Sequence, residues 1–149
     1  MARLEYRLDD AEHGFPLLYF YDFIDKDEVS LRFACDYFVK DRVVYEKKVC
    51  SVESNKYILY VALASDEHAW EGAGEVDPYW GGIRIELREF REGTDRYPVV
   101  HRYEFQDNDD ALLILQSDRL TLQGRVWENT STEVDEDRKV YVYYAVPGA

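Results

Sequence analysis

The stretch Ile-Arg-Ile-Glu-Leu-Arg at positions 83–88 carries the plainest structural signal in the chain. Apolar and charged residues alternate through it, so Ile83, Ile85 and Leu87 would face one way and the charged residues the other. This period of two is typical of a β-strand with one dry face and one wet face. Turn-forming residues at 92–95 separate it from a second alternating run at 99–105, which predicts a β-hairpin.

Strand patterns recur along the rest of the chain. Residues 17–24 and 57–64 are apolar on nearly both faces, as expected for strands that are covered on two sides. Residues 31–39 alternate and lead through a turn at 40–42 into residues 43–50, which predicts another hairpin. Shorter strand patterns lie at 120–126 and 139–146.

One helix is expected near residues 108–117, because Asp107 or Asn108 can cap it and acidic residues occupy its first turn. The pattern therefore predicts a mainly β protein, an antiparallel sandwich or barrel of about eight or nine strands with one short helix. The alternative is an α+β fold in which a single antiparallel sheet carries the helix on one face. We expect a single domain over residues 1–149 without internal repeats.

The chain is strongly acidic, with a net charge of −13 from 31 acidic and 18 basic residues. Nucleic-acid binding depends on Lys and Arg, so nucleic acid is not an expected partner. An anionic membrane surface is disfavoured for the same reason. The charge favours solubility, or recognition of a basic protein.

Two cysteines, Cys35 and Cys50, are too few for a disulfide framework, and we expect both to be reduced. The first residues contain no apolar segment typical of a signal peptide. No run of apolar residues is long enough to cross a bilayer. These features favour a cytoplasmic location.

The segment 65–82, SDEHAWEGAGEVDPYWGG, interrupts the strand patterns with acids, glycines and aromatics. Such long irregular segments are often functional. Aromatic side chains anchor many protein interfaces, whereas the alternative role for the tryptophans is to cover a sheet edge. The candidate binding residues are Trp70, Tyr79, Trp80, His68 and Glu71.

Motifs for other chemistry are weak. His68 and Glu71 have helical spacing for a metal site, but they occur once, so no metal and no cofactor is expected. The acids at 107–110 resemble the start of a calcium loop, yet leucines occupy the later ligand positions, and helix capping explains them better. His101 lies on an apolar strand face, where a half-buried structural role is typical. No catalytic motif is present.

The sequence therefore predicts a non-enzymatic interaction or regulatory module that uses the segment 65–82. Its partner would be another protein, with the charge favouring a basic one, or a second copy of the chain. The alternative is a small-ligand-binding barrel or sandwich, with a cavity lined by tyrosines of two strands. Those strand faces carry Tyr19, Tyr21 and Phe23 on one strand and Tyr141, Tyr143 and Ala145 on the other.

Overall fold

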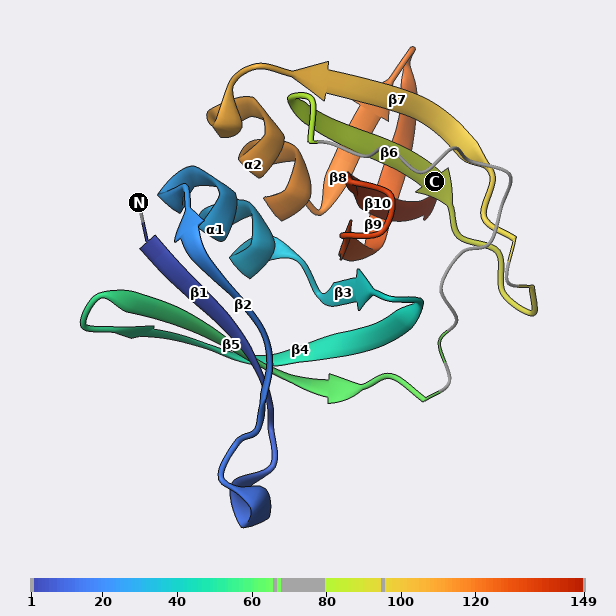
Figure 1. Cartoon of the computed structure of the whole chain (residues 1–149). Helices are drawn as coiled ribbons and strands as arrows, with labels where there is room; N and C mark the ends of the chain where they lie inside the picture. The colour runs from blue at the N-terminus through green and yellow to red at the C-terminus, as the bar shows by residue number, and fades with distance from the viewer. Residues whose placement is uncertain (1, 66, 68–79, 95, 149) are drawn as a thin grey trace.

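A computed structural model describes residues 2–65, 67, 80–94 and 96–148 (Figure 1). Strands dominate, which confirms the mainly β class, and one mixed sheet contains the ten strands found among these described residues. In chain order the elements are β1 (Ala2–Leu8), η1 (Ala11–His13), β2 (Leu17–Ile24), α1 (Lys26–Ala34), β3 (Tyr37–Lys40), β4 (Val43–Glu53), β5 (Lys56–Leu63), β6 (Ile83–Glu89), β7 (Val99–Phe105), α2 (Asn108–Gln116), β8 (Arg119–Leu122), β9 (Arg125–Asp135) and β10 (Val140–Pro147).

The strand order reads β2-β1-β5-β4-β3-β9-β10-β6-β7, and β8 pairs with β9 beside this path. Neighbouring strands are mostly antiparallel, as expected. Three pairs are parallel: β1 with β5, β6 with β10, and β3 with β9. The first two of these pairs are alike. In each pair the two strands are the first and the last of five consecutive strands, and one α-helix lies between them in the sequence.

The chain is an internal duplication, which corrects the expectation that it contains no repeat. The element sequence strand, strand, helix, strand, strand, strand occurs twice, as β1 to β5 with α1 and as β6 to β10 with α2. Within each repeat the strand order is the same, because β2-β1-β5-β4-β3 matches β7-β6-β10-β9-β8. The helices begin at positions 26 and 108, so equivalent residues lie 82 positions apart there.

Strand register repeats along with the topology. Leu4 lies opposite Tyr57 in the first repeat, and their counterparts Ile85 and Tyr141 lie opposite each other in the second. Irregularities recur as well: the β1–β2 ladder shifts between Tyr6 and Arg7, and the β6–β7 ladder shifts at the equivalent residues 87 and 88. Bulges tend to be retained within protein families, so their recurrence at equivalent positions supports a common origin of the two repeats.

The repeat leaves short traces in the sequence. YDFIDKDE at 21–28 matches YEFQDNDD at 103–110, with tyrosine, phenylalanine and two aspartates in the same places. RLEYR at 3–7 matches RIELR at 84–88. Both matches place charged or capping residues at the same structural positions of the two repeats.

Helix α1 corrects the expected strand over residues 31–39. Asp25 caps the helix by accepting a hydrogen bond from the Asp27 backbone N–H at 2.9 Å. Acidic residues then occupy the first turn, as in α2. The alternation of apolar residues extends into the helix only by coincidence, and the strand is limited to β3. Its hairpin with β4 is confirmed from residue 37 onwards.

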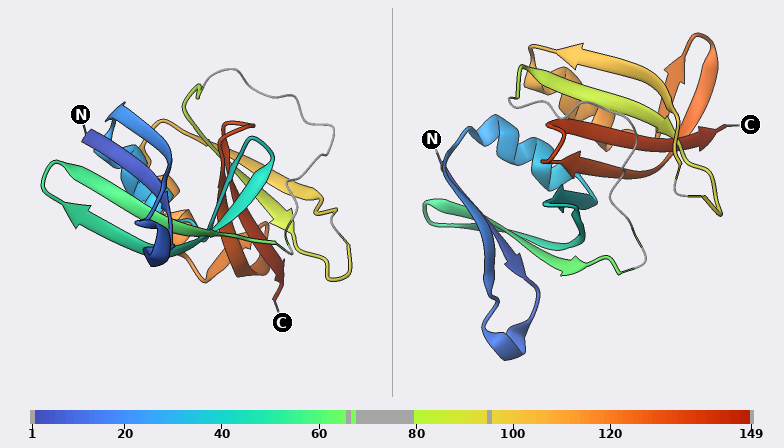
Figure 2. Two further views of the ribbon diagram at one scale, coloured as in Figure 1. Left: turned by 60° about the horizontal axis from the view of Figure 1, so that its bottom comes forward. Right: turned by 45° about the vertical axis from the view of Figure 1, so that its right-hand side comes forward.

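The two helices pack against each other between the strands of the two repeats (Figures 1 and 2). One cluster of buried apolar side chains extends from β1 and α1 to α2 and β10, so the repeats share their largest core. The repeats are therefore joined through side chains as well as through the sheet. Their contact region is a natural place to look for a site.

Candidate functional site

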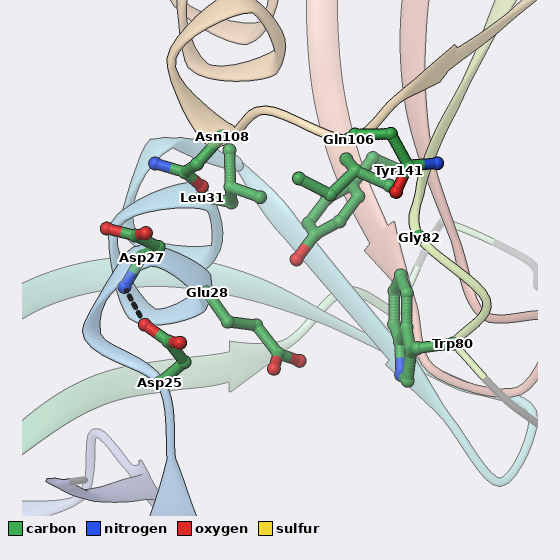
Figure 3. Close-up of a pocket in the computed structure, with 10 residues that line it drawn as sticks. Asp25, Asp27, Glu28, Leu31, Trp80, Gly82, Gln106, Asn108 and Tyr141 are labelled. Atoms are coloured by element: carbon green, nitrogen blue, oxygen red, sulfur yellow. Dashed lines mark hydrogen bonds between the residues drawn. The ribbon is translucent and has the colours of Figure 1, made fainter.

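A cavity of about 240 Å³ lies where the two repeats meet (Figure 3). The first repeat contributes the beginning of α1. The second contributes the segment before β6, the turn between β7 and α2, and a tyrosine of β10. The lining residues are Asp25, Asp27, Glu28 and Leu31 from the first repeat, and Trp80, Gly82, Ile83, Gln106, Asn108 and Tyr141 from the second.

Three carboxylates gather on one side of the cavity because a helix begins there. Asp25 is the N-cap, and Asp27 and Glu28 occupy the first turn, where negative charge offsets the helix dipole. The Glu28 carboxylate projects from α1 into the space facing Trp80 (Figure 3). The α1 side of the cavity is therefore negatively charged.

Arg32 lies behind this acidic wall and is 1% exposed. Its Nη2 donates to Glu136 Oε2 at 2.6 Å and to Glu28 Oε1 at 3.1 Å. Burial opposes its charge, but the surroundings, Tyr6 and Glu136 foremost, raise the pKa of Arg32 above its ordinary value. Arg32 thus stays charged and ties α1 to the turn between β9 and β10.

Trp80 forms the aromatic wall opposite α1. Its ring centroid lies 5.2 Å from that of Tyr141, and the Arg32 guanidinium lies 5.8 Å from the Trp80 ring. The chain turns at Gly82 with φ of +93°, a conformation that glycine adopts without strain. Trp80 is half-buried and packs on the shared core, which is the covering role considered for the tryptophans.

Several polar atoms of the cavity wall lack a hydrogen-bond partner among the described residues. Tyr141 is 1% exposed, and its hydroxyl group is one of these atoms. Asn108 Oδ1 and Trp80 Nε1 are the others. Burial raises the pKa of Tyr141 well above its ordinary value, so the hydroxyl keeps its proton. Buried polar groups normally find partners, and these atoms can accept or donate bonds to a bound group.

Of the residues predicted to bind a partner, the structure places Trp80 in this cavity. Trp70, Tyr79, His68 and Glu71 lie outside the described residues. The acids at the start of α1 and Asn108 were not predicted as site residues, and Tyr141 was predicted only as part of the alternative tyrosine-lined cavity. The signal that could have found them is the match between residues 21–28 and 103–110, which marks a second helix start.

A second group of charges lies on the opposite face of the second repeat. Arg88 and Arg138 both donate to the buried carboxylate of Glu86. Burial opposes ionisation of Glu86, but these bonds and charges lower its pKa overall. The equivalent Glu5 accepts bonds from Arg3 and Arg7, so the arrangement recurs in both repeats and is structural.

Glu133 and Asp135 are the buried acids nearest to this group. Burial first, and then the charge of Asp135, raises the pKa of Glu133 to about 8. Burial also raises the pKa of Asp135 to about 6. Tyr144 donates a hydrogen bond to Glu133 at 3.2 Å. These two acids are therefore sensitive to pH near neutrality.

The other predicted residues have structural roles. Asp107 caps α2 by accepting a hydrogen bond from the Asp109 N–H at 2.9 Å, which confirms the capping prediction. His101 is half-buried and its ring meets that of Tyr103 edge-on at 4.6 Å. Within the described ranges, no group of three or more His, Cys, Asp or Glu side chains is placed to hold a metal ion.

The tyrosine-bearing faces are part of packed structure. Tyr141 and Tyr143 are buried in the shared core, and Tyr19 and Tyr21 pack against it. Phe23, expected on the same face, is 83% exposed. The rings of Tyr6 on β1 and Phe38 on β3 also stack, with their centroids 3.8 Å apart. Side chains therefore occupy this part of the interior.

Among the described residues, no helix combines the length and apolar character that crossing a bilayer requires. Comparisons with protein-family models, curated proteins and solved structures find nothing that matches this chain. The cavity between the repeats is therefore the candidate functional site.

Proposed function

We propose that the protein is a non-enzymatic interaction module that binds a basic partner protein at the face containing the cavity. One observation carries the proposal: three acidic residues at the start of α1 and Trp80 line a cavity that retains polar atoms without a partner among the described residues. Aromatic anchors surrounded by polar groups are characteristic of interface centres. Trp80 and Gly82, at the described end of the segment 65–82, line the cavity on this face.

The charge of the whole chain supports a basic partner. With a net charge of −13, the protein attracts cationic surfaces over distances of about 10 Å at moderate salt. The same charge makes two copies repel each other, so a different protein fits better than self-association. Nucleic acid would be repelled for the same reason.

The cysteines fit a reducing compartment such as the cytoplasm. Cys35 and Cys50 are both free thiols. Burial raises the pKa of Cys35 and also that of Cys50, so neither forms the reactive thiolate readily at neutral pH. Both thiols are therefore better suited to packing than to nucleophilic chemistry.

The alternative function, binding of an apolar ligand in a tyrosine-lined cavity, has less support. The cavity between the repeats is lined by carboxylates, and its volume of about 240 Å³ lies below the usual range for small-molecule sites. Such sites typically measure roughly 300–1,000 Å³ and are mostly apolar. A protruding side chain of a partner suits the cavity better.

Selection of short random peptides against the folded protein tests the proposal. We expect enriched sequences to be rich in Lys and Arg, and their affinity to fall steeply between about 0.05 and 0.5 M salt. Asp27→Asn should weaken binding, whereas Asp109→Asn, at the equivalent position of α2, should not. Enrichment of neutral or acidic sequences, or equal effects of the two variants, would contradict the proposal. A mass that rises with concentration would indicate self-association instead.

A further inference from the structure

The Glu28 carboxylate has room for a second guanidinium. Among the described residues it accepts one hydrogen bond, from Arg32, and its side chain is 33% exposed. The other carboxylates of this kind are saturated: Glu5 is shared by Arg3 and Arg7, and Glu86 is shared by Arg88 and Arg138. A carboxylate that bridges two arginines is therefore a recurrent arrangement in this protein, and at Glu28 the described residues supply one arginine.

We infer that the cavity binds the guanidinium group of an arginine side chain presented by the partner protein. This inference rests on the proposed function and names the group that enters the cavity. A guanidinium offers five N–H donors in a plane, and it stacks on aromatic rings. The cavity supplies matching acceptors and an aromatic ring.

Acceptors face the cavity from both repeats. Glu28 and Asp25 lie on the α1 side, and Asn108 Oδ1, which has no partner among the described residues, lies on the α2 side. The Tyr141 hydroxyl group, deeply buried and without a partner in the described part of the chain, points toward Glu28 (Figure 3). Because these acceptors are spread around the cavity, they match the planar guanidinium group of arginine better than the compact ammonium group of lysine.

The aromatic wall already accommodates a guanidinium. Arg32 lies 4.9 Å from the Tyr21 ring centroid and 5.8 Å from that of Trp80. A second guanidinium against the cavity side of Trp80 would meet the same kind of ring surface. Glu28 would lie between the two cations, as Glu86 lies between Arg88 and Arg138.

The local charge balance remains negative with Arg32 included. Asp25, Asp27, Glu28 and Glu136 carry four negative charges, whereas Arg32, the exposed Lys26 and Lys139, which lies 3.9 Å from Glu136, carry three positive ones. The positive end of the α1 dipole adds roughly half a charge, and Asp25 already caps it. A single cation is therefore still favoured.

The second repeat provides an internal control. Asp110 of α2 is equivalent to Glu28, and Tyr57 is equivalent to Tyr141. Lys26 takes the place that Asn108 occupies in the cavity, so a positive side chain replaces an acceptor. We expect no guanidinium binding at the equivalent place near α2.

Titration of the full chain with N-acetyl-arginine methylamide, followed by calorimetry and by amide and indole N–H shifts in NMR spectra, tests the inference. We expect a dissociation constant of about 1–10 mM, with shifts concentrated at Trp80 and α1. The citrulline analogue has nearly the same shape without charge and should bind at least about tenfold more weakly. The lysine analogue should fall between them.

Variants separate binding from folding. Tyr141→Phe removes a hydroxyl group that has no partner in the described structure, so it should leave the melting temperature unchanged while weakening arginine binding severalfold. Glu28→Gln should weaken binding about tenfold, and Asp110→Asn should leave it unchanged. No binding at about 50 mM arginine probe, equal binding of citrulline, or equal effects of the two acid variants would overturn the inference.

The outcome can be distinguished from that of the proposed function. If selected basic peptides bind the face but tolerate replacement of every arginine by citrulline, the interaction proposal stands and the guanidinium site fails. If the arginine probe binds as expected but no peptide or protein does, the site stands and the interaction proposal fails.

Discussion

Val52 and Val134 occupy equivalent positions in the two repeats, yet Val52 is 70% exposed and Val134 is 1% exposed. The difference follows from the pairing of β3 with β9, which places Phe38 beside Val134. At the equivalent part of β4, no described strand lies beside Ser51 to Glu53 on the side away from β5. One of the two symmetric junctions between the repeats is thus closed, and the other is open.

Truncating each of these valines measures the effect of the junction. Val134→Ala should lower the free energy of unfolding by about 1–3 kcal/mol, because it removes buried methyl groups and leaves a cavity. Val52→Ala should change it by less than about 0.5 kcal/mol. Chemical denaturation of both variants provides the comparison, and equal losses would show that the second junction is also closed in solution.

Glu133 should make stability depend on pH. Because its pKa is raised from 4.5 to about 8 in the folded state, the folded protein retains a proton between these values that the unfolded chain has released. Its contribution to stability is therefore complete below about pH 4.5 and is lost as the pH rises through about 8. The loss is on the order of a few kcal/mol. Asp135 acts in the same direction at lower pH.

Urea unfolding of wild type and Glu133→Gln at several pH values checks this dependence. The variant should gain stability relative to wild type as the pH rises from about 5 to about 9, because a glutamine side chain does not ionise. Glu128→Gln, at a more exposed position of the same strand, serves as the control and should show no such trend. A difference that stays constant with pH would refute the assignment.

Arg32 and Glu136 should be strongly coupled. Replacing Arg32 by Met removes the nearer of two cations from the buried Glu136 carboxylate and leaves only Lys139, at 3.9 Å, so the cost should be about 3–5 kcal/mol. Adding Glu136→Gln should recover part of this loss, so the double variant should be more stable than the sum of the single changes implies. A double-mutant cycle by denaturation measures the coupling, and strict additivity would argue against the ion pair.

The cap of α2 should contribute independently of the cavity. Asp107→Ala removes the side chain that accepts the Asp109 N–H, and it should cost about 1 kcal/mol. Asp107→Asn should retain most of the stability because the amide oxygen can also accept. Asp109→Ala alters only the helix dipole interaction and should cost roughly a few tenths of a kcal/mol. Thermal melts distinguish these changes, and equal losses for the alanine variants would be inconsistent with a cap.

Most strands and α2 could be predicted from the sequence, because alternation and capping are local patterns. Helix α1 was missed because the apolar residues from Leu31 to Val39 also alternate with period two, and tertiary packing decides between helix and strand. The duplication resolves the ambiguity. Asp25 and Asp27 match Asp107 and Asp109, so the recognised start of α2 implies a helix start at the equivalent place.

The candidate site could be predicted only in part. Trp80 attracted attention because aromatic residues in irregular segments often bind partners. Glu28 could not be placed because the helix that carries it was not predicted, and Tyr141 was predicted only as the lining of a cavity for a small ligand. They meet Trp80 only because α1 of one repeat packs beside β10 of the other, and no local pattern encodes that proximity.

The ladder between β3 and β9 has a consequence for biosynthesis. It is the only described strand pairing that joins the repeats, and all other described ladders close within one repeat. Once the nascent chain has emerged from the ribosome as far as Leu63, every strand that pairs with β1, β2, β4 or β5 has been synthesised. We expect the first half to assemble while the second is still being translated, with the edge of β3 awaiting β9 as an open template for misdirected pairing.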